Sequence, residues 1–496
     1  MRISGIRWAA LPMALALAAC GGGSGSSDSG GGGGSSSGTP EAPAWSERIE
    51  PYDPGQAGSA AKAAAQQSSA LADPADTRAV TLGPLPESLV KAAAGAPAAP
   101  GVPRQIGQPR SVAGTAGVAA TAALLRWRPA PDGTQVAALR FESQGARGVR
   151  LGVLVQALPP GAVLRFYGAA RDEAVEVGAQ ELQDVAGRNA RAGAADAVAR
   201  TYWSPDFGGP QTTLEVQIPS AAPPAAVRLA VPGLSHFTVS PAEAEGGVAA
   251  KALGDAGSCE IDVSCDAAYL EQSRSVARMT YVDETGASFY CTGTLLNDAA
   301  SSGTPYFLGA NHCISTQAVA STLVTDWLFR AASCGSGVNS GAWRLTGGAT
   351  LLYASAATDT SFMRLNRQAP AGIVYAGSYY GGVPAGTALA SVHHPEGDLQ
   401  KLSLGTLRRY GNCSGGSCGA SDSGSGGFLV LDWQQGSTER GSSGAAAFIT
   451  IGERRYVTGQ LYGGTASCTA PSGVDYFGRF DLSYRAALYK WLNPGR

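Results

Sequence analysis

The positions of the cysteines divide this chain of 496 residues into two unlike parts. Cys20 lies near the N-terminus, and the other eight all lie beyond residue 258: Cys259, Cys265, Cys291, Cys313, Cys334, Cys413, Cys418 and Cys468. An even number of cysteines in an exported segment is typical of a disulfide framework. Structural zinc is the competing interpretation, but no spacing here looks like the paired CxxC motifs of zinc sites, so we expect no metal and no other cofactor. Residues 252–496 are therefore predicted to form one disulfide-bonded domain.

The N-terminus predicts export. Two arginines precede a short apolar run, which is too short to span a bilayer and ends in Leu-Ala-Ala-Cys at Cys20. This ending resembles a bacterial lipobox, so residues 1–20 are predicted to be a lipoprotein-type signal peptide with Cys20 as the lipidation site. An ordinary secretory signal is the alternative. We expect an outer-membrane lipoprotein, or an extracellular protein once its N-terminal region is cleaved off, with membrane contact only through the lipid.

The rest of the N-terminal half contains no cysteine and two kinds of sequence. Residues 21–118 are rich in Gly, Ser, Ala and Pro and are predicted to be a tether and linker. Residues 119–251 contain runs in which apolar residues alternate, which predicts half-buried antiparallel strands and a small β-sandwich. A net charge of −2 with 15% charged residues argues against nucleic-acid binding.

Residues 252–496 contain the side chains that acyl transfer requires. His312 follows the apolar run Phe307-Leu308-Gly309-Ala310 and precedes Cys313, a setting typical of the general base of a chymotrypsin-like protease. Ser443 lies in Gly441-Ser442-Ser443-Gly444, where glycines permit the tight turn that presents a nucleophilic hydroxyl. The amides of Gly441 and Ser443 are the predicted oxyanion hole.

The carboxylate that orients the base is predicted to be Asp359, since the polar residues around it give way to a strand that Phe362 and Met363 would anchor in the core. Asp326 is the rival candidate. The order His, Asp, Ser differs from the orders found in α/β-hydrolases and subtilisins. We therefore predict a mainly β chain: a chymotrypsin-like double β-barrel with a C-terminal helix, preceded by the β-sandwich.

Several motifs in residues 257–494 resemble the bacterial lysyl endopeptidases, the Achromobacter-type lysine-specific proteases of the trypsin-like clan. The matching motifs are Gly257 to Cys265, Cys291 to Asn297, His312-Cys313, His393-His394-Pro395, Gly441 to Gly444, Gly459 to Gly464, and Asp475 to Arg479. The resemblance implies the bridges Cys259–Cys468, Cys265–Cys334 and Cys291–Cys313, and it leaves Cys413 and Cys418 to pair with each other.

The resemblance also implies a pocket for the lysine side chain that precedes the cleaved bond (P1). Asp475 and Glu439 match the acidic residues of that pocket, and Tyr462 and Gly463 match the substrate-binding strand, with Tyr462 where the lysine-specific enzymes have His. A buried carboxylate that faces a cation disfavours neutral P1 residues.

The lysine count agrees with that specificity. The chain has only five lysines, and one of them, Lys251, falls at the predicted domain junction. A lysine-directed enzyme could cut at Lys251–Ala252 and release itself from residues 119–251. It would meet few cleavage sites in residues 252–496, which contain only two lysines. Residues 119–251 would then be a pro-domain that contacts the protease domain.

We therefore expect a monomeric serine endopeptidase that acts on proteins or peptides, most strongly after Lys. A protease that cleaves after both Lys and Arg is one alternative. A catalytically silent, lipid-anchored binding protein on the same scaffold is another.

Overall fold

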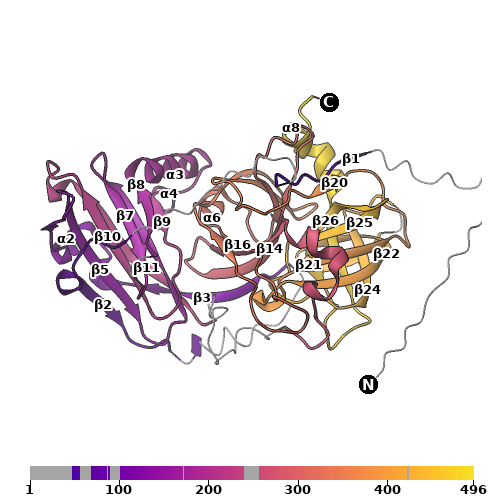
Figure 1. Ribbon diagram of the computed structural model, residues 1–496, viewed down its shortest axis with the longest axis horizontal. Coiled ribbons are helices and arrows are strands. Elements are labelled where there is room, and N and C mark those ends of the chain that lie inside the picture. Colours follow the sequence, from indigo (N-terminus) through magenta and orange to yellow (C-terminus); the bar gives the residue numbers. More distant parts are fainter. Residues whose placement is uncertain are drawn as a thin grey trace, which may run out of the picture. The chain divides into compact units, whose positions relative to one another are not determined.

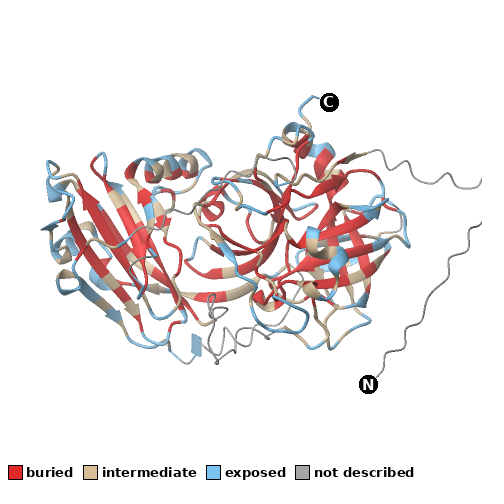
Figure 2. Cartoon of the chain, in the orientation of Figure 1, coloured by how far each residue is buried: buried red, intermediate tan, exposed pale blue. Residues whose placement is uncertain are grey.

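This computed structural model describes residues 47–55, 69–86, 88–89, 101–170, 173–239, 256–421 and 424–495. Most of its ordered elements are strands, and buried residues are concentrated in these strands (Figure 2). Cys20, Lys251 and Ala252 lie outside the described residues. No helix in the described part is both long enough and apolar enough to cross a bilayer.

The N-terminal domain is a sandwich of two sheets, as the alternating apolar runs predict. One sheet contains β2 (Arg78–Leu82), β4 (Arg128–Pro129), β5 (Gln135–Ser143), β7 (Val163–Tyr167), β8 (Val175–Gly178) and β10 (Gln211–Ile218). The other contains β3 (Arg104–Ser111), β6 (Gly148–Ala157), β9 (Thr201–Trp203) and β11 (Arg228–Phe237). Phe141 and Leu214 from the first sheet share one buried core with Leu151 and Leu229 from the second. Figure 1 shows α3 (Ala179–Arg191) beside this sandwich.

Residues 256–495 form two β-barrels. The first contains six strands paired in the order β16-β13-β14-β15-β19-β18: β13 (Val276–Val282), β14 (Ser288–Leu296), β15 (Tyr306–Ala310), β16 (Val324–Trp327), β18 (Ala349–Ser355) and β19 (Thr360–Leu365). The second is a closed ring, β21-β22-β24-β27-β26-β25: β21 (Ala388–His393), β22 (Lys401–Ser414), β24 (Phe428–Gln435), β25 (Ala446–Ile451), β26 (Arg454–Gly464) and β27 (Val474–Arg479). This is the chymotrypsin-like double barrel that the sequence predicts.

The C-terminal helix packs where the two barrels meet. It consists of α7 (Phe480–Ser483), a π-helical turn (Tyr484–Leu488) and α8 (Tyr489–Leu492). Phe480, Leu488 and Leu492 belong to one buried cluster that also contains Leu308 of the first barrel and Phe448 of the second. The helix therefore holds the barrels together through apolar burial.

The shorter elements complete the fold. They are β1 (Arg48–Ile49), β12 (Ile261–Asp262), β17 (Trp343–Leu345), β20 (Gly377–Tyr379), β23 (Ser417–Ala420), α2 (Val118–Leu124), α4 (Asp196–Ala199), α5 (Leu270–Ser273) and α6 (Gln317–Ala320). Four disulfides join Cys259 to Cys468, Cys265 to Cys334, Cys291 to Cys313, and Cys413 to Cys418.

The segment 21–118, which we expected to be tether and linker, contains ordered strands in its described part. β1 pairs with β20, β2 pairs with β5, and β3 pairs with both β11 and β14. The sequence of β3, Arg-Gln-Ile-Gly-Gln-Pro-Arg-Ser, has a single strongly apolar residue, Ile106, and therefore shows no alternation. Its neighbours on both sides supply the backbone hydrogen bonds, so composition alone could not reveal the strand.

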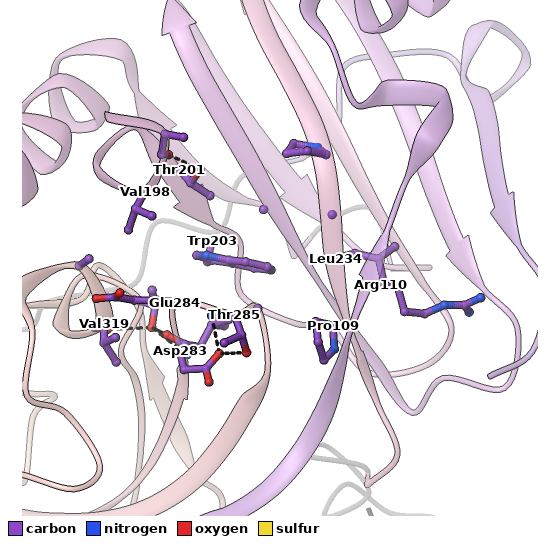
Figure 3. A pocket seen from close by; sticks show the side chains of 18 of the residues that line it. Pro109, Arg110, Val198, Thr201, Trp203, Leu234, Asp283, Glu284, Thr285 and Val319 are labelled. Atoms are coloured by element: carbon purple, nitrogen blue, oxygen red, sulfur yellow. Dashed lines mark hydrogen bonds between the residues drawn. The ribbon is translucent and has the colours of Figure 1, made fainter. Parts of the chain in front are cut away.

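β3 makes the sandwich and the first barrel parts of one continuous sheet. It pairs with β11 on one side, and on the other its Arg104 and Gln105 stand opposite Tyr290 and Phe289 of β14. A pocket of about 450 Å³ lies between the same two parts of the fold, where Trp203 of β9 faces the turn that contains Asp283 and Thr285 (Figure 3). Its lining includes neither His312 nor Ser443.

Candidate active site

The pairing of β15 with β19 brings His312 and Asp359 together. Ala310, the last residue of β15, stands opposite Thr360, the first residue of β19, so the residues just outside both strands must meet. The His312 amide donates to Oδ1 of Asp359 at 2.9 Å, and Nδ1 of the imidazole lies 2.7 Å from Oδ2. Because an ionised carboxylate only accepts, this contact keeps the ring proton on Nδ1 and leaves Nε2 as an acceptor.

Asp359 adopts a strained backbone conformation at this position. Its φ is +48°, in the left-handed region that few residues other than glycine occupy. Its own carbonyl accepts from the Asn311 amide at 2.8 Å, so both its main chain and its carboxylate are fixed against the His312 loop. Strain of this kind persists where surrounding contacts hold the backbone in place, and functional sites are a common location.

The outer nitrogen of the imidazole is available. Nε2 of His312 is buried and has no hydrogen-bond partner among the described residues, Ser443 included. The ring of Tyr462 stands edge-on to the imidazole, with 5.5 Å between the ring centroids. The site therefore contains an oriented base with an unused acceptor.

The Ser443 turn is packed directly against this loop. The carbonyl of Ser443 accepts from the Thr292 amide at 2.8 Å and lies 4.0 Å from Sγ of Cys313, the residue after His312. Ser443 is therefore close to the imidazole loop, although no hydrogen bond joins Oγ to Nε2. Catalytic contacts of this kind are often long in the absence of substrate.

Glycine is required on both sides of the serine. Gly441 has φ +95° and Gly444 has φ +86°. A Cβ at Gly441 would lie 2.7 Å from the His394 carbonyl oxygen, and one at Gly444 would lie 2.4 Å from the Thr292 carbonyl oxygen. Neither the Gly441 amide nor the Ser443 amide donates to another described residue. Two backbone donors beside a serine are what an oxyanion hole needs.

The rival residues have structural roles. Asp326 forms buried ion pairs with Arg278 and Arg344, at 2.9 Å each. Burial opposes its ionisation, but the Arg344 and Arg278 guanidiniums outweigh that effect and lower its pKa to about 2. The remaining histidines, His236, His393 and His394, are buried, and burial lowers the pKa of each.

Asp475 lies on β27, fully buried, beside the start of the Ser443 turn. Its Oδ2 accepts from Nε1 of Trp433 and from Oγ1 of Thr438, both at 2.6 Å, whereas Oδ1 is buried without a partner among the described residues. Burial raises its pKa to about 6, against the hydrogen bonds from Thr438 and Trp433. Glu439 follows Thr438, and its Oε2 accepts from the Gly257 amide at 2.9 Å. The two predicted pocket acids are therefore linked through Thr438, which bonds to Asp475 and precedes Glu439.

The segment around Gly101 lies against the predicted substrate strand at Tyr462. The sequence did not predict this contact. The Gly101 amide donates to the Tyr462 carbonyl at 3.1 Å, and a Cβ at Gly101 would lie 2.6 Å from the Tyr462 ring. Gly463 follows with φ +128°. Three residues after Gly101, Arg104 pairs with Glu396 at 2.9 Å, and Glu396 contacts Arg440 of the Ser443 turn at 3.4 Å.

Two groups in the described residues have the spacing of metal ligands: Cys291 with His312 and Cys313, and Cys259 with Glu260 and Cys468. The cysteines of each group are joined in a disulfide and cannot supply thiolates. These two groups are therefore unsuited to a metal.

Comparisons with known proteins place the chain in a family. Residues 81–238 match the family model "Lysyl endopeptidase N-terminal domain", and residues 253–478 match "Lysyl endopeptidase, C-terminal domain". A lysyl endopeptidase of Pseudomonas aeruginosa is 33% identical over 376 residues, which are 73% of this chain and 76% of that protein.

Solved structures of serine proteases also align with part of the chain. The active form of the Rv3671c protease from M. tuberculosis has 12% identity and a TM-score of 0.31, covering 46% of this chain and 86% of that one. The HtrA-type protease AlgW with a tripeptide has 14% identity and a TM-score of 0.31, covering 46% and 64%. With both domain models matched and a relative aligned over most of its length, the chain belongs to the lysyl endopeptidase family and is a serine endopeptidase.

Proposed function

We propose that this protein is a lysine-directed endopeptidase with His312, Asp359 and Ser443 as its catalytic triad. The observation that carries the proposal is the His312 imidazole, which Asp359 holds by two hydrogen bonds and whose Nε2 is left free beside the Ser443 turn. Such an arrangement supports acyl transfer, because the base is oriented before substrate arrives.

The proposed reaction has two halves. Oγ of Ser443 attacks the scissile carbonyl carbon while Nε2 of His312 takes the hydroxyl proton, and the Gly441 and Ser443 amides stabilise the oxyanion. The imidazolium then gives its proton to the departing amine, which leaves an acyl-enzyme. Water repeats the sequence: His312 takes its proton, the new acid is released, and the proton returns to Ser443. Asp359 orients the ring and stabilises the imidazolium.

The preference for lysine is argued from Asp475. Its partnerless, buried Oδ1 beside the Ser443 turn suits a cationic P1 side chain, because an incoming ammonium would supply the missing donor. Cleavage after both Lys and Arg is the alternative, since a guanidinium would also meet this carboxylate.

We further propose that the N-terminal domain is a pro-region and that the chain is exported. Gly101 occupies a backbone acceptor of the substrate strand at Tyr462, which supports a masked cleft. Self-cleavage at Lys251–Ala252 would separate the two domains in sequence, and the lipobox-like ending at Cys20 supports a lipid anchor on the part upstream of that cut. The mature enzyme would then be extracellular and the uncut chain attached to the outer membrane.

Replacing the nucleophile should remove catalysis without removing binding. We expect Ser443→Ala to lower kcat on a P1-lysine peptide by at least about 10⁴-fold, with KM nearly unchanged, because only the attacking oxygen is lost. The exposed serine variant Ser336→Ala is the control and should keep wild-type kinetics. Activity of Ser443→Ala within tenfold of wild type would refute the assigned triad.

The lysine preference should weaken in acid. Asp475, with a pKa of about 6, is ionised above that pH and becomes protonated below it, so the pocket loses its charge as pH falls. Taking the ratio of kcat/KM for P1-lysine over P1-methionine peptides removes pH effects that both substrates share, and we expect this ratio to drop below pH 6. Asp475→Asn should lower the ratio roughly 10- to 100-fold at pH 8 and flatten its pH dependence. A ratio independent of pH in the wild type would contradict the assignment.

The proposed self-cleavage at the domain junction can be tested by replacing Lys251. The wild-type preparation should yield a mature N-terminus at Ala252, whereas Lys251→Gln should leave the chain joined and its cleft masked. N-terminal sequencing together with intact mass measures this, and the exposed Lys490→Gln variant is the control. A permanently attached binding domain would instead give an active, uncut wild-type chain.

A further inference from the structure

A third acid lies close to the proposed lysine pocket, and the mechanism above does not use it. The side chain of Glu260 is 1% exposed, and neither of its carboxyl oxygens has a hydrogen-bond partner of normal geometry among the described residues, although the Ser437 backbone interacts with the group. A buried polar group without a partner is costly unless something else satisfies it. The residue therefore has unused capacity to bind a donor.

In the part of the chain that the structure describes, no Lys or Arg forms an ion pair with Glu260. Nε2 of His393 is 3.8 Å from its Oε2 and also lies 2.9 Å from Oγ of Ser403. Burial lowers the pKa of His393 to about 3, so this ring is neutral. Lys401 also faces the group, but its ammonium is 2.5 Å from Asp262.

The segment that carries Glu260 is part of the pocket wall. Gly257, three residues earlier, donates its amide to Oε2 of Glu439. A Cβ at Gly257 would lie 2.6 Å from Oε1 of Glu439 and 2.5 Å from Sγ of Cys468. Cys468 is bonded to Cys259, and its Sγ lies within 4.8 Å of a carboxyl oxygen of Glu260. One disulfide and one glycine therefore hold Glu260 and Glu439 in the same small region.

The acids of this region offer acceptors on three separate side chains. Asp475 presents Oδ1, Glu439 presents Oε1, which accepts from no described residue, and Glu260 presents its carboxyl group. An ammonium has three donors that point in different directions, whereas a guanidinium presents a flat fork that suits a bidentate carboxylate. Asp475 and Glu439 each offer one oxygen and not a pair, so acceptors spread over three side chains match the diverging donors of an ammonium.

We propose that Glu260 is a specificity-determining residue that binds the P1 lysine ammonium together with Asp475 and Glu439. The inference rests on the proposed lysine pocket and adds the reason why that pocket favours lysine over arginine.

Glu260 should lose its proton when a lysine side chain binds. Burial, reinforced by repulsion from Glu439, raises its pKa to about 9, so the carboxyl is neutral in the free protein at pH 7. An ammonium beside it stabilises the ionised form, and the released proton passes to the solvent. Binding of a lysine side chain is therefore coupled to loss of one proton from Glu260 and should tighten as pH rises from about 6 to 9.

The test uses n-butylammonium, a mimic of the lysine side chain, as a competitive inhibitor of the active enzyme prepared from the full chain. Its charge is constant from pH 5.5 to 9, since its pKa is close to that of lysine at about 10.4. In the wild type we expect Ki to fall in two steps, one near pH 6 from Asp475 and one between pH 6 and 9 from Glu260. In Glu260→Gln the upper step should vanish, and Ki at pH 9 should be about tenfold weaker.

Further variants separate the possible outcomes. Asp475→Asn should remove the lower step. If neither Asp475→Asn nor Glu439→Gln changes Ki, the lysine pocket itself is wrong. If those two variants weaken binding and Glu260→Gln does not, only the present inference fails. A fall in kcat shared by all P1 residues, with Ki unchanged, would assign Glu260 to support of His393 instead. The exposed Glu453→Gln is the control, and Glu260→Asn replaces Glu260→Gln if the latter does not fold.

Discussion

The two hydrogen bonds between His312 and Asp359 depend on β15 and β19 ending at the same point of the first barrel. The register of that strand pair fixes the imidazole, selects its tautomer and leaves Nε2 as the acceptor. The Ser443 turn and the ring of Tyr462 both lie close to this imidazole. The Ser443 turn comes from the second barrel, and the apolar cluster under the C-terminal helix keeps the two barrels in contact. A shift of one residue between the strands would separate the base from its carboxylate.

The N-terminal domain contacts the first barrel through a strand pair, a hydrogen bond and an ion pair, in addition to its contact at the substrate strand. β3 continues the sheet through β14, and Arg150 of the sandwich donates to the Thr322 carbonyl at 2.6 Å. Arg344 lies 3.3 Å from Asp206 of the sandwich and 2.9 Å from Asp326 of the barrel. Contacts of this extent suit a domain that folds together with the protease, which is consistent with the proposed pro-region.

The sequence predicts the features that depend on neighbouring residues, such as the site segments, and on the number of cysteines, such as the disulfide-bonded domain. Strand endings and glycines in the sequence predict His312, Asp359 and the Ser443 turn as the site, and the fold brings these three segments together. The double barrel, predicted from the same order, is confirmed. The disulfide pairings and the proposed pocket acids came from family resemblance, since spacing alone does not pair eight cysteines. β3 and the Gly101 contact could not be found, because partners far away in sequence stabilise them. Glu260 gave no signal, because its burial without a partner is a property of the folded chain.

The most direct test of this account is to treat the active enzyme with a fluorophosphonate and to map the adduct by mass spectrometry. A serine activated by His312 should give one adduct per chain, on Ser443, and His312→Ala should slow its formation by several orders of magnitude. No adduct, or an adduct on another residue, would show that the free Nε2 of His312 does not activate Ser443.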